Sequence, residues 1–132
     1  MNTARFVDAH DTIEDPYLRD LVRVLLSDEM VHGQFGFQYL ELVKEWLEER
    51  EDVRVSLRRY LAYAFAILER TMSGAGAPKR TLSDDERALG IPDPARHPEI
   101  FYQTITAAVI PGLERFGIDA GTAWKERAAR RA

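Results

Sequence analysis

Residues 16–47 read PYLRDLVRVLLSDEMVHGQFGFQYLELVKEWL and carry the strongest helical pattern of the chain. Alternating steps of four and three residues select one stripe of positions: Leu18, Val22, Leu25, Glu29, His32, Gly36, Tyr39, Val43 and Trp46. A stripe with this spacing is typical of a long helix that packs at a shallow angle in a bundle. We therefore expect this stripe to face the core.

Two neighbouring positions of the stripe are polar, Glu29 and His32. A carboxylate and an imidazole lose favourable hydration in a core unless another group pairs with them. Residues three apart lie on one face of a helix, so both side chains can bind one metal ion. In the alternative interpretation, His32 is a buried core histidine that hydrogen-bonds to Glu29 or to a neighbouring helix. The spacing by itself leaves both interpretations open.

The pattern along the rest of the chain predicts an all-α protein with one domain over residues 1–132. Helical periodicity continues to Met72, which is too long for one helix of a globular protein. We therefore expect a turn near residues 50–52 and a long antiparallel helical hairpin. The expected segments are a short helix over 3–13, the ligand helix over 16–49, a second helix over 52–72, a linker with a short helix over 73–97, and a C-terminal helix over 98–116, followed by a last helix that Thr122 caps.

Composition excludes several classes of protein. The chain has 132 residues, a net charge of −4 and no cysteine. An acidic protein is a poor non-specific ligand of nucleic acid or of an anionic membrane. Without cysteine there are no disulfides, thiolate metal sites or cysteine nucleophiles. Since no apolar leader or membrane-spanning run is visible, we expect a cytoplasmic protein.

The residues around the Glu–His pair resemble a known family. SDEMVHGQFGF at 27–37, preceded by DPYLR at 15–19, is similar to the final ligand helix of a ferritin-like domain. The likeness is to bacterial proteins with a D-P-x-x-R…I-L-x-D-E-x-x-H-x-x-F-G-[FW] pattern. ALGIPDP at 88–94 and IPGL at 110–113 also fit that family's tail. The resemblance covers most of the chain and corresponds to the C-terminal half of the family's domain.

This resemblance implies a metal site. Glu29 and His32 would be ligands of iron, in a di-iron centre or with manganese instead, and Asp28 would accept a hydrogen bond that orients a ligand histidine. The arginine that many relatives carry between the two ligands is Val31 here. Such centres use two Glu-x-x-His pairs and two further Glu residues, whereas this chain has one pair. The chain would then be a shortened family member, or a half-bundle completed by a homodimer or by a partner chain that supplies the other half.

Glu69 is a further candidate ligand. A turn near residue 50 would bring it level with His32, and it interrupts an otherwise apolar stretch. In a dimer, Glu29, His32 and Glu69 of each chain would provide four carboxylates and two imidazoles. The alternative is an exposed Glu69 beside Arg70.

Two classes of function follow from these observations. The first is a ferritin-like metal-binding protein, a di-iron oxidase or oxygenase in which iron binds and reduces dioxygen. Iron storage is a variant of it that would need a large cage. The second is a truncated or degenerate non-catalytic helical protein that acts through self- or hetero-association. A wide apolar face favours the second class: Leu21, Leu25, Phe35, Leu42 and Trp46. Whether the protein is an enzyme stays open.

Overall fold

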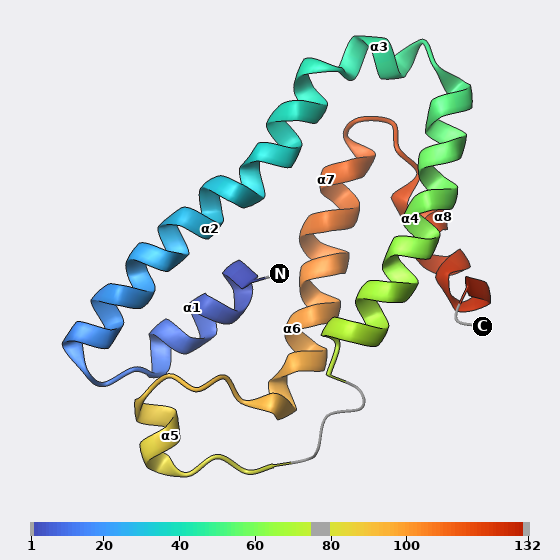
Figure 1. Cartoon of the computed structure of the whole chain (residues 1–132). Helices are drawn as coiled ribbons and strands as arrows, with labels where there is room; N and C mark the ends of the chain where they lie inside the picture. Colours follow the sequence, from blue (N-terminus) through green and yellow to red (C-terminus); the bar gives the residue numbers. More distant parts are fainter. Residues whose placement is uncertain (1, 75–79, 131–132) are drawn as a thin grey trace.

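The computed structural model describes residues 2–74 and 80–130, and all regular structure in those ranges is helical (Figure 1). This confirms the predicted all-α class. Part of the expected linker, residues 75–79, lies outside the described ranges. The elements are α1 (Asn2–Thr12), α2 (Pro16–Leu42), α3 (Lys44–Glu48), α4 (Glu51–Met72), α5 (Asp84–Ala88), the 3₁₀ turn η1 (Pro94–Arg96), α6 (His97–Thr104), the π-helical turn η2 (Ile105–Val109), α7 (Ile110–Glu114), α8 (Ala120–Glu126) and the 3₁₀ turn η3 (Arg127–Arg130).

The corner between α1 and α2 is fixed by side chains that hydrogen-bond to the backbone. The Asp15 carboxylate accepts from the Leu18 N–H at 2.9 Å, and Pro16 occupies the first turn of α2. This cap satisfies a backbone donor that has no partner within the helix. The Arg19 Nε donates to the Ile13 carbonyl at 3.0 Å, which ties the start of α2 to the end of α1.

The segment expected as one helix over 16–49 contains two helices. α2 ends at Leu42, and the chain bends at Val43 before α3. The bend buries Leu47, and the Arg54 guanidinium donates to the carbonyls of Leu47 and Glu48 at 3.1 and 2.7 Å. An arginine of the next helix therefore satisfies the carbonyls at this corner, which needs neither glycine nor proline.

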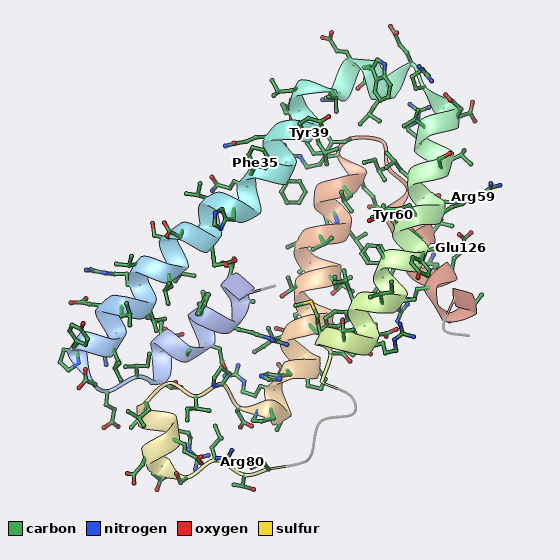
Figure 2. All side chains as sticks on the ribbon, viewed as in Figure 1. Phe35, Tyr39, Arg59, Tyr60, Arg80 and Glu126 are labelled. Atoms are coloured by element: carbon green, nitrogen blue, oxygen red, sulfur yellow. The ribbon has the colours of Figure 1, made fainter. Side chains whose placement is uncertain are left out.

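The two long helices diverge rather than pack along each other. In Figure 1, α2 and α4 form the two arms of an open V, with α6 and α7 between them. In Figure 2, Phe35 and Tyr39 lie on α2 and Tyr60 on α4, on either side of α7. The main neighbour of α2 is the short helix α1.

No helix in the described part is long and apolar enough to cross a membrane.

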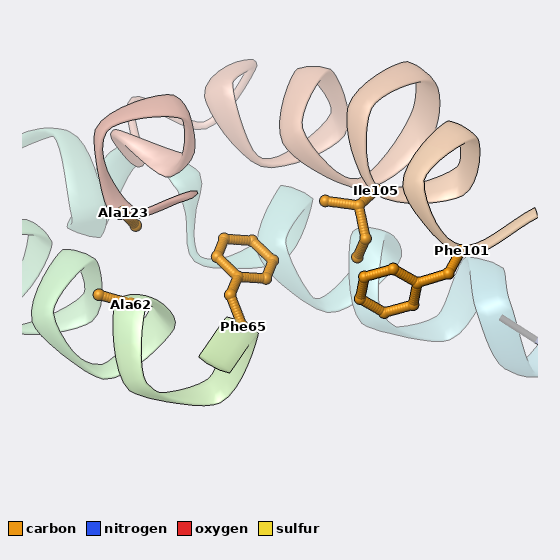
Figure 3. Packing of buried hydrophobic residues seen from close by; sticks show 5 residues of the cluster. All are labelled: Ala62, Phe65, Phe101, Ile105 and Ala123. Carbon is orange, nitrogen blue, oxygen red and sulfur yellow. The ribbon is translucent and has the colours of Figure 1, made fainter. Parts of the chain in front are cut away.

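The core lies between α4, α6, η2 and α8 (Figure 3). Ala62 and Ala123 are fully buried, and their small side chains let α4 and α8 approach closely. Phe65 fills the space beside them and meets the Trp124 ring edge-to-face, with centroids 5.3 Å apart. This core cluster is therefore built by α4 and the helices that follow it, and α2 contributes no buried residue to it.

Pro111 alters the backbone hydrogen bonding between α6 and α7, but the helical path continues. Proline lacks an N–H and its ring crowds the carbonyl four residues earlier, so an α-helix cannot run through it undisturbed. The π-helical turn η2 ends at Val109, two residues before Pro111, and opens the hydrogen-bond ladder at that point. Gly112 then lets α7 approach α2, since a Cβ at Gly112 would lie 2.6 Å from the Phe37 ring.

Side chains cap the starts of α5 and α8, and the cap of α8 differs from the predicted one. Ser83 and Glu86 form a reciprocal capping box at the start of α5, with bonds of 3.2 and 2.9 Å. The last helix is capped by Asp119, whose carboxylate accepts from the Thr122 N–H at 3.1 Å. Thr122 is therefore the donor at this helix start, and the cap is three residues earlier than predicted.

Candidate functional site

Glu29 and His32 lie one turn apart at the middle of α2, but they are not buried together. The half-buried positions of α2 follow one side of the helix: Leu18, Val22, Leu26, Glu29 and Leu40. Most of this side faces α1. His32 is exposed, and no residue of α2 is buried. The expectation that both side chains occupy a core is wrong for the single chain, because α1 covers only part of the predicted stripe.

A second stripe with heptad spacing runs along the uncovered side of α2. We call it the outer stripe, and its members are Tyr17, Leu21, Val24, Asp28, Val31, Phe35, Gln38 and Leu42, all of them exposed. Leu25, His32 and Tyr39 flank it on one side and are also exposed. Tyr17, Phe35 and Leu42 have exposed fractions of 78%, 69% and 85%. At full areas of roughly 150–250 Å² for large apolar residues, the apolar members and flanks together expose roughly 1,000 Å².

Glu69 is buried and paired within its own chain. Its exposed fraction is 6%. Its carboxylate oxygens accept from Nε and Nη2 of Arg127, both at 3.1 Å, and from the Tyr102 hydroxyl at 2.8 Å. The Arg127 guanidinium in turn stacks on the Trp124 ring, 3.4 Å from its centroid. These contacts hold the C-terminal segment on α4.

This arrangement corrects two expectations from the sequence. Glu69 is not an exposed residue beside Arg70, and its oxygens serve Arg127 and Tyr102 rather than a site shared with Glu29 and His32. The Arg127 side chain is only 17% exposed, although it lies in an arginine-rich stretch of the chain. The sequence offers one signal for the ion pair of Glu69 and Arg127. Glu69 follows an apolar stretch, and Arg127 comes three residues after Trp124.

The described residues of one chain do not fit a di-iron centre. No three His, Asp or Glu side chains in that part of the protein gather to hold a metal ion. Asp28, which the resemblance places beside a ligand histidine, is exposed on the outer stripe one turn before His32. One chain therefore offers at most a partial ligand set at the middle of α2.

Two further groups of polar residues escaped the sequence reasoning. A hollow of about 450 Å³ lies between α1 and α6, and its lining includes the ion pair of Asp8 and Arg96. At the start of α6, burial and the nearby Arg5 lower the pKa of His97. Arg5 also donates to the Met72 carbonyl at 2.9 Å, so this group joins α1, the end of α4 and α6. No motif marks either group in the sequence.

Compared with known proteins, the chain matches no family model, no curated protein and no solved structure. The ferritin-like relationship therefore remains an expectation based on the motif around Glu29 and His32.

Proposed function

We propose that this protein acts as an assembly, in which the outer stripe of α2 packs against the same stripe of a second copy. The observation that carries this proposal is that α2, a helix of 27 residues, has no buried residue, although six of the eight positions of the outer stripe are apolar. The largest apolar patch on an ordinary monomer covers about 300–600 Å². The outer stripe exceeds this range.

The area of the stripe fits a stable homodimer. A standard protein interface buries about 800 Å² on each partner, and the outer stripe with its flank offers roughly 1,000 Å². A two-fold interface uses one patch on both copies, so the patch must complement itself. A heptad stripe meets this condition, because it can supply both the side chains and the spaces between them.

An antiparallel arrangement gives the stripe a consistent register. α2 spans Pro16–Leu42, and its middle residue is Glu29. With a two-fold axis just after this residue, Tyr17 lies opposite the partner's Leu42, and Val24 opposite the partner's Phe35. Each of these two pairs joins an aromatic to an aliphatic side chain, whereas the polar Gln38 and Asp28 lie opposite the partner's Leu21 and the partner's Val31. One edge of the stripe carries the uncharged Ser27 and Gln34 near the axis, and the carboxylates Asp20 and Glu41 lie farther out on the same edge.

Sedimentation velocity of the full chain over the micromolar range tests this proposal. We expect a dimer for the natural protein and a monomer for Phe35→Asp, which places a charge in the stripe. Met30→Asp is the matched control, since Met30 is an exposed apolar residue of α2 outside the stripe and its flank. A natural protein that stays monomeric, or a Phe35→Asp dimer as tight as the control, would overturn the proposal.

A ferritin-like metal protein is the second candidate. It is favoured by the position of Glu29 and His32 at the middle of α2, where a two-fold axis would double the number of ligands. Bound iron would supply redox chemistry toward dioxygen, and manganese is the alternative metal. The cytoplasmic location expected from the sequence belongs to this proposal too.

Native mass spectrometry after anaerobic iron loading tests the second candidate. Iron retained by a dimer, and lost in both Glu29→Ala and His32→Ala, is the expected result. Iron-free dimers after desalting would leave only the association function.

A further inference from the structure

Asp28 and His32 lie on the same exposed side of α2. We propose that these two residues from two copies of the chain form a binding site for a divalent cation such as zinc. This inference rests on the proposed dimer. It differs from the site that the resemblance implies, because it uses Asp28 in place of Glu29. Asp28 belongs to the outer stripe and His32 to its flank, four residues on, whereas Glu29 is on the half-buried side together with Leu18 and Val22.

The register brings the four side chains to one place. With the two-fold axis just after Glu29, Asp28 of one copy lies about one residue from the level of the partner's His32, or about 1.5 Å along the axis. The same holds for the symmetric pair. In antiparallel helices the equivalent flanks of the two stripes face each other, so both imidazoles lie on one side of the interface. Two carboxylates and two imidazoles therefore converge beside the axis.

The charge of the stripe favours a bound cation in the dimer. Asp28 is the only charged member of the outer stripe, and it lies at the centre of that stripe. Dimerisation would bury two like charges close together, which opposes association unless a positive group compensates them. A divalent cation neutralises both carboxylates at once. Imidazole nitrogen and carboxylate oxygen in a set of four suit tetrahedral zinc.

The site is incomplete in one chain. Asp28 and His32 supply two ligands, and no third His, Asp or Glu joins them among the described residues. The monomer should therefore bind a cation weakly with two ligands, and the dimer should bind it more tightly with four. Association and cation binding should then strengthen each other, since a ligand that binds only the dimer shifts the equilibrium toward it.

The test compares dimerisation of the full chain after removal of metal with dimerisation in the presence of zinc, by sedimentation velocity. With zinc at about ten times its dissociation constant for the dimer, we expect the dimer to be tightened roughly tenfold. Native mass spectrometry should show one zinc per dimer. Asp28→Asn and His32→Asn should abolish this dependence. Glu29→Gln is the matched control and should keep it.

Asp28→Leu gives a second, independent readout. It removes the buried charge, so the metal-free dimer should be tighter than that of the natural protein and insensitive to zinc. All these positions are exposed or half-buried in the monomer, and the substitutions leave the core intact.

The outcomes separate this inference from the proposed function. A dimer whose affinity is unchanged by zinc overturns the cation site and leaves the dimer standing. Loss of the zinc effect in Glu29→Gln but not in Asp28→Asn also overturns it, in favour of the site that the resemblance implies. A monomer with and without zinc overturns both proposals.

Discussion

Glu69→Ala should destabilise the protein strongly, because it leaves the buried Arg127 without its counter-charge. The carboxylate of Glu69 receives two hydrogen bonds from Arg127 and one from Tyr102. Breaking a buried ion pair by removing one partner costs about 3–5 kcal/mol. Since a small domain has about 5–15 kcal/mol of total stability, the loss should be visible as a large shift of the urea midpoint measured by circular dichroism.

A double-mutant cycle separates the interaction energy between Glu69 and Arg127 from the contributions of the surrounding residues. Arg127→Met alone should also destabilise, because the carboxylate is then left buried and partly unsatisfied. Glu69→Met combined with Arg127→Met should recover much of the loss, since replacing both charges with apolar groups is often neutral or stabilising by about 1–4 kcal/mol. The two single effects should therefore fail to add.

Glu126→Ala is the matched control. Glu126 lies 3.8 Å from Arg58, and both side chains are more than 30% exposed, so its removal should cost less than about 1 kcal/mol. A loss of under about 1 kcal/mol in Glu69→Ala, or strictly additive effects in the cycle, would refute the assignment of Glu69 as a structural partner of Arg127.

Two further predictions concern a glycine contact and a histidine. Gly112→Ala should destabilise by about 1–3 kcal/mol, because its Cβ would overlap the Phe37 ring, and Gly36→Ala is the control, since a Cβ there meets nothing within 4 Å and should stabilise α2 by about 0.5–1 kcal/mol. Urea unfolding checks both, and equal effects of the two substitutions would contradict the packing of α7 on α2. The lowered pKa of His97, caused by burial and by Arg5, keeps the imidazole neutral in the folded protein where the unfolded chain binds a proton. Its contribution to stability is therefore complete above the ordinary pKa of 6.5 and is lost as the pH falls through the lower folded value. His97→Asn should flatten the acid side of the stability curve, and an unchanged pH dependence would argue against this environment.

The sequence determined the local structure of this protein. Asp15 and Pro16 begin α2, and Ser83 with Glu86 begins α5, because each satisfies backbone donors within a few residues of itself. The helical class follows from the same local hydrogen bonds and from the apolar periodicity. These signals act over short distances along the chain, so they can be recognised without knowing what packs on the helix.

Only the tertiary structure decided which side of each helix is buried. The periodicity of α2 placed Glu29 and His32 on one stripe, but α1 covers a neighbouring side and leaves His32 exposed. Glu69 and Arg127 are 58 residues apart, and nothing local in either segment specifies the partner. Burial and ion pairing depend on which elements meet in space. The sequence therefore identified the residues at the middle of α2, while the arrangement of α1, α4 and α8 decided what those residues and Glu69 contact.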